Sequence, residues 1–135
     1  MTTYRVRLIA DLLGVSDDTV RRWADSGRLP ASRDEAGRVT VTGADLAAFA
    51  DDVAARTAPP LPRGVVRTSA RNRLTGLVTQ VHRDGLMARV EMRCGPFRLV
   101  SLMTKDAADE LGLEPGALAV AAVEAHDVAV EVPGA

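Results

Sequence analysis

The sequence predicts an α+β protein with two domains, a mainly helical one followed by a strand-rich one. Three observations lead to this prediction. Apolar residues recur with helical spacing in three segments before residue 57, and they alternate with polar residues in several segments after residue 68. Between them lies the proline-rich stretch TAPPLPRGVV, which favours an extended linker. We therefore expect domains at 1–56 and 68–135, joined by a linker at 57–67.

Composition narrows the classes of function. The 135 residues carry a net charge of −1, so nucleic acid must be held by a local basic patch. Cys94 is the only cysteine and the two histidines lack partners at metal-ligand spacing, so we expect no disulfide and no metal site. Asp11 interrupts the first apolar run, and no run approaches the roughly 20 residues of a membrane helix. We expect a soluble, cytoplasmic protein without membrane contact, and no catalytic arrangement that would make it an enzyme.

The first domain begins with two predicted helices joined by a tight turn. Apolar residues have helical spacing over 6–13, and Gly14 permits the turn that follows. Ser16 has the side chain of an N-cap for a second helix at about 17–26, and Gly27 ends that helix. This order predicts a helix-turn-helix.

The second helix separates an apolar stripe from a charged face. Val20, Trp23 and Ala24 recur at i, i+3 and i+4 and form the predicted buried stripe, in which Trp23 serves as a core anchor. Arg21 and Arg22 remain on the open face. A helix with this division suits insertion into the major groove of DNA.

A hairpin and a third helix complete the predicted first domain. Ala36 and Gly37 form a turn, after which Val39 and Val41 alternate with polar residues in the manner of a strand. Residues 44–56 have the apolar spacing of a helix. The segment is therefore expected to contain three helices and a β-ribbon wing.

Residues 4–50 resemble the excisionase-like, MerR-related winged helix-turn-helix family. The shared pattern consists of the apolar first helix, GVSDDTVRRW, SGRLPA, a short hairpin and ADLAAF. The resemblance implies contact with double-stranded DNA through two groups of residues. They are Ser16, Thr19, Arg21 and Arg22 on the recognition helix, and Arg33 and Arg38 in the wing. Asp17 and Asp18 depart from the expected charge, which suggests that two copies bind DNA together.

After residue 68 the sequence predicts five strands and one short helix. Strands are expected at 74–82, 88–94 and 97–103, and Thr104 is suited to cap a helix in TKDAADEL. Alternating residues over 118–132 predict two further strands. One helix between the third and fourth of five strands is the order of an OB-like β-barrel.

The second half resembles a Mop (molbindin, TOBE-type) domain. The resemblance rests on SARNRLTGLV, SLMTKDAADELGL and AVEAHDV. Such domains bind molybdate or tungstate at subunit interfaces of dimers or hexamers. A Mop domain behind a helix-turn-helix also resembles the layout of ModE-type molybdate-responsive regulators.

The resemblance implies a set of oxyanion ligands, and it also shows two departures from the family pattern. The implied ligands are Ser69, Ala70, Arg71, Asn72, Thr104 and Lys105. A second hydroxyl is usual where Ala107 stands, and a lysine is usual at Glu124. Two hypotheses follow: either oxyanion still binds at this set, or Glu124 pairs with Arg71 or Arg73 and leaves a domain that only oligomerises.

Together these features predict a DNA-binding transcriptional regulator that senses molybdate or tungstate through an oligomeric Mop domain. Two alternatives stay open at this point. The chain could bind and store the oxyanion, with the first domain as an attachment. It could also bind DNA without any response to oxyanion, a possibility that Glu124 and Ala107 favour.

Overall fold

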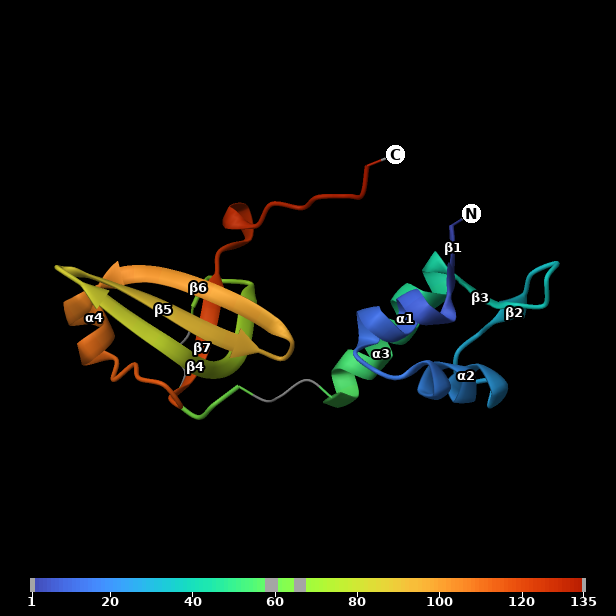
Figure 1. The fold of residues 1–135 in the computed structure, drawn as a ribbon, viewed down its shortest axis with the longest axis horizontal. Coiled ribbons are helices and arrows are strands. Elements are labelled where there is room, and N and C mark those ends of the chain that lie inside the picture. Colours follow the sequence, from blue (N-terminus) through green and yellow to red (C-terminus); the bar gives the residue numbers. More distant parts are fainter. Residues whose placement is uncertain (1, 58–60, 65–67, 135) are drawn as a thin grey trace. The chain divides into compact units, whose positions relative to one another are not determined.

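The computed structural model describes residues 2–57, 61–64 and 68–134. The chain divides into two compact units, Met1–Ala58 and Pro59–Ala135, each with a hydrophobic cluster of its own (Figure 1). In the stretch predicted as a linker, Thr57 belongs to the last helix of the first unit. Residues 58–60, with Pro59 and Pro60, and residues 65–67 lie outside the described part.

The first unit contains the three predicted helices and the predicted hairpin. Its elements are β1 (Thr3–Arg5), α1 (Val6–Leu13), α2 (Asp17–Asp25), β2 (Ser32–Arg33), β3 (Val39–Thr42) and α3 (Gly43–Thr57). The short strand β1 was not predicted; it pairs with β3, so that the sheet has the order β1-β3-β2. The helical predictions and the wing are thus confirmed, and the wing gains a third strand.

Local chemistry explains the turn between α1 and α2. Gly14 adopts a left-handed conformation with φ of 68°, and its N–H closes the last turn of α1 on the carbonyl of Ala10. The Ser16 hydroxyl oxygen then accepts a hydrogen bond from the Thr19 N–H at 3.2 Å, which caps α2. Both predicted roles are confirmed.

The core of the first unit is formed by apolar side chains from all three helices and from the sheet. Ile9, Val20, Leu29 and Val41 are at most 1% exposed and pack together between the helices and the sheet. Trp23 packs against this cluster and meets the ring of Phe49 edge to face, with ring centroids 5.0 Å apart. The predicted role of Trp23 as a core anchor is confirmed. The packing therefore fixes α2 by its apolar stripe and leaves its charged face free.

The second unit is a four-stranded antiparallel sheet with one short helix. It contains β4 (Asn72–Asp84), β5 (Met87–Cys94), β6 (Phe97–Thr104), α4 (Lys105–Glu110), β7 (Leu118–Val123) and a 3-10 turn, η1 (Ala125–Asp127). The sheet order is β6-β5-β4-β7. Thr104 caps α4 through a hydrogen bond of 3.1 Å from the Ala107 N–H, as predicted.

The long strand β4 changes partner along its length. Its first half, from Asn72 to Leu77, pairs with β7, whereas the half from Leu77 to Asp84 pairs with β5. A bulge between Val78 and Gln80 interrupts the ladder with β5. Because a bulge increases local twist, the sheet coils at this point, and Figure 1 shows the curved ribbon that results.

The predicted inner face of β5 is confirmed. Ala88, Val90, Met92 and Cys94 are all buried, and the last three belong to the core cluster of this unit. Burial raises the pKa of the Cys94 thiol. Cys94 is therefore a core residue, as predicted.

The predicted fifth strand is not formed. Only one of the two strands expected over 118–132 is present, because β7 ends at Val123 and η1 follows. Residues 128–134 have no strand partner within the described part of the chain. An alternating pattern becomes a strand only where a free sheet edge is beside it. The α+β class is confirmed, but the sheet is open where a closed five-stranded barrel was predicted.

No helix in the described ranges is long and apolar enough to cross a lipid bilayer.

Candidate nucleic-acid and oxyanion sites

The exposed face of α2 holds a small network of polar side chains. The Ser16 and Thr19 hydroxyl oxygens lie 3.0 Å apart, and the Arg22 guanidinium donates to the Thr19 oxygen at 3.1 Å. Arg21 pairs with Asp18 one turn earlier, with 3.7 Å between nitrogen and oxygen. The structure thus brings Ser16, Thr19 and Arg22 together and orients Arg22 through Thr19. Arg21 does not join this network, because its side chain pairs with Asp18 and lines a cavity beside the wing.

Asp34 organises the wing. Its carboxylate accepts hydrogen bonds from the backbone N–H groups of Ala36 and Arg38, at 3.0 and 2.9 Å. It also pairs with the guanidinium groups of Arg38 at 3.1 Å and Arg5 at 3.8 Å. The pKa of Asp34 lies below its ordinary value, mainly because its carboxylate accepts the Arg38 N–H. The Arg38 charge, the Ala36 N–H and Arg5 lower the pKa further, whereas partial desolvation raises it. A charged Asp34 therefore stabilises the hairpin turn and positions Arg38.

Arginines from α2, the wing and the start of α1 surround one cavity. This cavity has a volume of about 340 Å³, and its charged lining residues are Arg5, Arg7, Asp17, Arg21, Arg33 and Arg38. Arg33 is held there by a hydrogen bond of 2.7 Å to the carbonyl of Gly37. Five guanidinium groups and one carboxylate line the cavity. Asp34, Asp11 and Asp18 pair with four of these arginines, so the net positive charge is small, but the guanidinium groups still suit the phosphates of a nucleic acid.

Sequence reasoning missed Arg5 and Arg7. Both precede or begin the first helix, and neither belongs to the motif that indicated DNA contact. Arg5 reaches the wing because β1 pairs with β3, with Arg5 opposite Thr40. The missing signal was the strand β1, which is only three residues long.

Four of the predicted oxyanion ligands, residues 69–72, lie at or just before the start of β4. The Asn72 side-chain nitrogen donates to the carbonyl of Val123 at 3.1 Å, and the Ser69 hydroxyl donates to the Glu124 carboxylate at 2.8 Å. The N–H of Ala70 donates to the Thr68 hydroxyl at 3.1 Å, so it is occupied. Glu124 therefore holds the hydroxyl that the family pattern assigns to an oxyanion.

The ion pair expected between Glu124 and Arg71 or Arg73 is not found among the described residues. Glu124 accepts the Ser69 hydroxyl instead, whereas Arg71 is exposed. The Arg73 Nε atom is buried and has no hydrogen-bond partner within the described ranges. The correction has a simple cause: Asn72 pairs with Val123, and this register sets Ser69 beside Glu124.

Thr104 and Lys105 lie at the other end of the sheet. Thr104 pairs with Met87, which in turn pairs with Asp84 at the end of β4. The Thr104 oxygen accepts from the Ala107 N–H, so its own O–H proton remains to be donated. The Lys105 N–H is bound to the carbonyl of Leu86 at 2.8 Å, and its side chain is exposed.

The two groups of predicted ligands are not brought together within one chain. They flank β4, whose 13 residues span up to about 40 Å at ~3.3 Å per residue. Coiling of β4 shortens this distance, but ligands at the two ends of so long a strand still lie beyond the reach of one tetrahedral oxyanion. An oxyanion that touches both groups would have to lie between two copies of the chain.

Comparison with known proteins adds the family of each half. Residues 3–52 match the model of the helix-turn-helix domain, and residues 68–130 match that of the TOBE domain. The chain is 30% identical to a molybdate-binding protein from Sporomusa ovata, over 50% of this chain and 100% of that one, with a TM-score of 0.48. It is 31% identical to MopII from Clostridium pasteurianum, over 49% and 100%, with a TM-score of 0.46.

A third solved structure is the cytoplasmic molybdate-binding protein ModG, at 41% identity over 44% of this chain and 43% of that one, with a TM-score of 0.43. None of the curated proteins compared matches the chain at a significant level. The two family models cover separate parts of the sequence and coincide with the two halves that carry the candidate sites. The chain is therefore a protein that carries a helix-turn-helix domain at residues 3–52 and a TOBE domain at residues 68–130.

Proposed function

We propose that this protein is a DNA-binding transcriptional regulator that responds to molybdate or tungstate. The observation that carries the proposal is an arginine-lined cavity beside α2 and the wing, in the same chain as a TOBE domain. The match at 30% identity over the whole length of the Sporomusa ovata molybdate-binding protein supports the choice of oxyanion.

Double-stranded DNA is the proposed partner of the first unit. α2 enters the major groove with Arg22, which Thr19 orients, while Arg21 and the wing residues Arg33 and Arg38 contact phosphates. Arg5 and Arg7 extend the same positive surface. The Asp18 carboxylate competes for Arg21, which limits the affinity of a single unit and favours binding by two.

The donor set of the second unit suits a tetrahedral dianion that two copies share. One copy would offer Thr104 and Lys105. The other would offer Ser69, Arg71 and Asn72. Their hydroxyl, guanidinium and ammonium groups are donors of the kind that such an anion requires. The Nε of Arg73, which has no hydrogen-bond partner among the residues that the structure describes, is a further donor close to Asn72. Glu124 opposes binding, since its carboxylate repels an anion and already accepts the Ser69 hydroxyl. The Asn72 amide would also have to exchange its bond to the Val123 carbonyl for one to the anion.

Assembly is proposed to occur through the second unit, as a dimer or hexamer. Of the 14 exposed large apolar side chains in the described ranges, 12 belong to this unit, and the remaining two are Leu8 and Leu12. A surface with so many exposed apolar groups is typical of a protein interface. Oxyanion bound between copies would alter the spacing of two helix-turn-helix units and, through avidity, their binding to DNA.

The test combines calorimetry with DNA binding on the full chain. Molybdate, tungstate and sulfate are titrated separately, and binding to DNA duplexes selected from a random pool is measured with and without molybdate. The proposal predicts saturable binding of molybdate or tungstate but not of sulfate, and a change in DNA affinity of about fivefold or more, the usual scale of allosteric coupling. The Glu124→Lys variant should bind oxyanion more tightly, because a donor replaces a repelling charge.

Each alternative function predicts a different result in this experiment. Tight oxyanion uptake without salt-dependent DNA binding would identify a storage protein and contradict the proposal. Sequence-specific DNA binding that ignores every oxyanion would identify a DNA-binding protein whose second unit only oligomerises, as Glu124 in contact with Ser69 would allow.

A further inference from the structure

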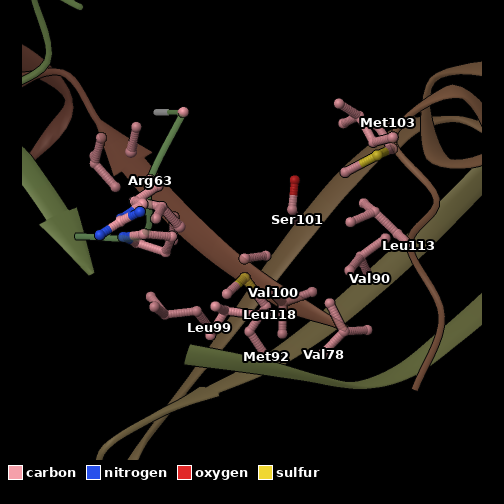
Figure 2. Close-up of a pocket in the computed structure, with 18 residues that line it drawn as sticks. Arg63, Val78, Val90, Met92, Leu99, Val100, Ser101, Met103, Leu113 and Leu118 are labelled. Atoms are coloured by element: carbon pink, nitrogen blue, oxygen red, sulfur yellow. The ribbon is translucent and has the colours of Figure 1, made fainter. Parts of the chain in front are cut away.

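The second unit offers an anion two different surroundings, one apolar and one polar. The first is an open cavity of about 570 Å³ beside the sheet, which Figure 2 shows with Val78, Val90 and Met92 among its lining side chains. Apart from Arg63 and Ser101, the described side chains that line it are apolar. A charged group would lose its hydration there, so the cavity does not suit an anion. The polar surroundings are those of the predicted ligands at the start of β4.

Glu124 distinguishes these polar surroundings. It directly follows β7, and its half-buried side chain lies beside Ser69, whose hydroxyl donates to the Glu124 Oε1 atom at 2.8 Å. The Asn72 amide, bound to the Val123 carbonyl at 3.1 Å, holds the two segments in this register. The other carboxylate oxygen of Glu124, Oε2, has no hydrogen-bond partner among the described residues. The carboxylate therefore has one oxygen engaged with Ser69 and one oxygen open to a further partner.

Four charged or titratable groups lie on the segments next to this carboxylate. Arg71 precedes β4 and Arg73 lies within it, whereas His126 and Asp127 pair with each other in η1, with 3.6 Å between Nε2 and Oδ1. None of the three basic side chains forms an ion pair with Glu124 in the described part of the chain. The charge of Glu124 would therefore act directly on an anion placed beside Ser69.

The contact between Glu124 and Ser69 can work in two directions. An ionised carboxylate only accepts hydrogen bonds, as does a molybdate or tungstate dianion, so the two repel each other while the Ser69 O–H is spent on Glu124. One added proton removes both obstacles. A protonated Glu124 donates to the Ser69 oxygen across the same 2.8 Å, and the Ser69 O–H can then turn to the oxyanion. Two acidic groups that share one site hold a single proton for the same electrostatic reason.

We propose that Glu124 is a proton-carrying positioning residue of the oxyanion site, so that each molybdate or tungstate ion binds together with one proton from solution. Glu124 holds this proton and donates to Ser69, and Ser69 donates its own proton to the oxyanion. The inference rests on the oxyanion site proposed above. Glu124 then opposes the anion only in its ionised form, and affinity rises as the pH falls, by about tenfold per pH unit while one proton is taken up.

The first test counts protons by calorimetry on the full chain. Molybdate is titrated in two buffers of different ionisation enthalpy, at several values between about pH 7 and 9, where ordinary carboxyl groups are ionised. We expect uptake of about one proton per oxyanion in wild type and a fall in affinity of about tenfold per pH unit. Glu124→Gln should bind more tightly, with no proton uptake and no pH dependence, because its amide N–H donates to Ser69 without a proton from solution.

Two further variants serve as controls. Glu114→Gln, in an exposed turn, and His126→Asn, beside the site, should both keep the proton uptake of wild type. The inference is overturned if wild type binds without proton uptake, if the uptake persists in Glu124→Gln or vanishes in His126→Asn, or if Glu124→Gln does not bind. Wild-type binding in any of these cases leaves the oxyanion site itself intact. If wild type, Glu124→Gln and Glu124→Lys all fail to bind molybdate and tungstate, the proposed site fails and the inference fails with it.

A second test locates the proton. Difference infrared spectra are recorded on addition of molybdate at about pH 8, where ordinary carboxyl groups are ionised. The band of a protonated carboxyl group should appear in wild type and in Glu114→Gln, and it should be absent in Glu124→Gln. Proton uptake by wild type without this band would place the proton on another group and overturn the inference.

Discussion

At the scale of single residues, Asp34 illustrates how one charged side chain shapes a recognition surface. Its carboxylate accepts hydrogen bonds from two backbone N–H groups of the hairpin turn and pairs with two arginines, Arg5 and Arg38, that line the cavity beside the wing. Asp34 itself offers nothing to DNA, since its charge has the wrong sign. Its contribution lies in the conformation that it gives to Arg38, and this contribution requires the ionised form.

The depressed pKa of Asp34 predicts a pH-dependent contribution to stability. Because the folded-state pKa lies below the unfolded value of about 3.8, the contribution is complete above that value and disappears as pH falls through the folded pKa. Asp34→Asn should therefore be less stable than wild type near neutral pH, with a difference that shrinks below about pH 4. Urea unfolding at a series of pH values measures this difference in the free energy of unfolding. The matched variant Asp51→Asn, on the exposed face of α3, should show no such convergence; a constant difference for Asp34→Asn would contradict the assignment.

At the scale of elements, Gly76 sets how closely β4 crosses β5. A Cβ atom at this position would collide with the backbone carbonyl of Arg93 and would lie 2.6 Å from the Cys94 sulfur. The backbone of a paired strand cannot move aside as the end of a flexible side chain can. The close packing of β4 on β5 therefore requires glycine at this position.

Gly76→Ala should consequently destabilise the second unit by about 2 kcal/mol, within the usual range for overpacking. The measurement is chemical unfolding followed by circular dichroism at a wavelength sensitive to strands. Gly134→Ala is the control, because nothing lies within 4 Å of a Cβ at that position. Equal stability of the two variants would show that β4 and β5 can separate without cost.

The helices and most strands could be predicted because their signals are local. Gly14, Ser16 and Gly27 delimit α1 and α2, and alternation identifies β5 with its correct buried face. The segment 128–132 carries an equally clear alternation, yet it forms no strand. Alternation specifies which side of a strand is apolar, whereas pairing requires a free edge, and sequence spacing does not show whether one lies beside the segment.

The candidate sites were predictable in part, and for the same reason. Arg21, Arg33 and Arg38 meet around one cavity as the motif implied, but Arg5 joins them only through the pairing of β1 with β3. Glu124 was identified as the critical departure, although its partner is Ser69 and not an arginine. Such contacts depend on register between strands that are distant in sequence, which the sequence pattern does not specify.

At the scale of the whole molecule, assembly and DNA binding make a joint prediction about salt dependence. Each phosphate contact adds about −0.9 to the slope of log affinity against log salt concentration. A unit that uses Arg21, Arg33 and Arg38 should therefore give roughly −2.7, and two linked units roughly −5.4. If copies are joined through the exposed apolar side chains of the second unit, Val130→Asp, which places a charge among them, should bind DNA more weakly and show about half the slope of wild type, because its units bind singly. Fluorescence anisotropy with a selected duplex between about 50 and 200 mM salt measures both slopes. Ala129→Asp removes no large apolar side chain and should retain the steep slope. A steep slope in Val130→Asp would mean that two first units bind DNA together without this apolar contact.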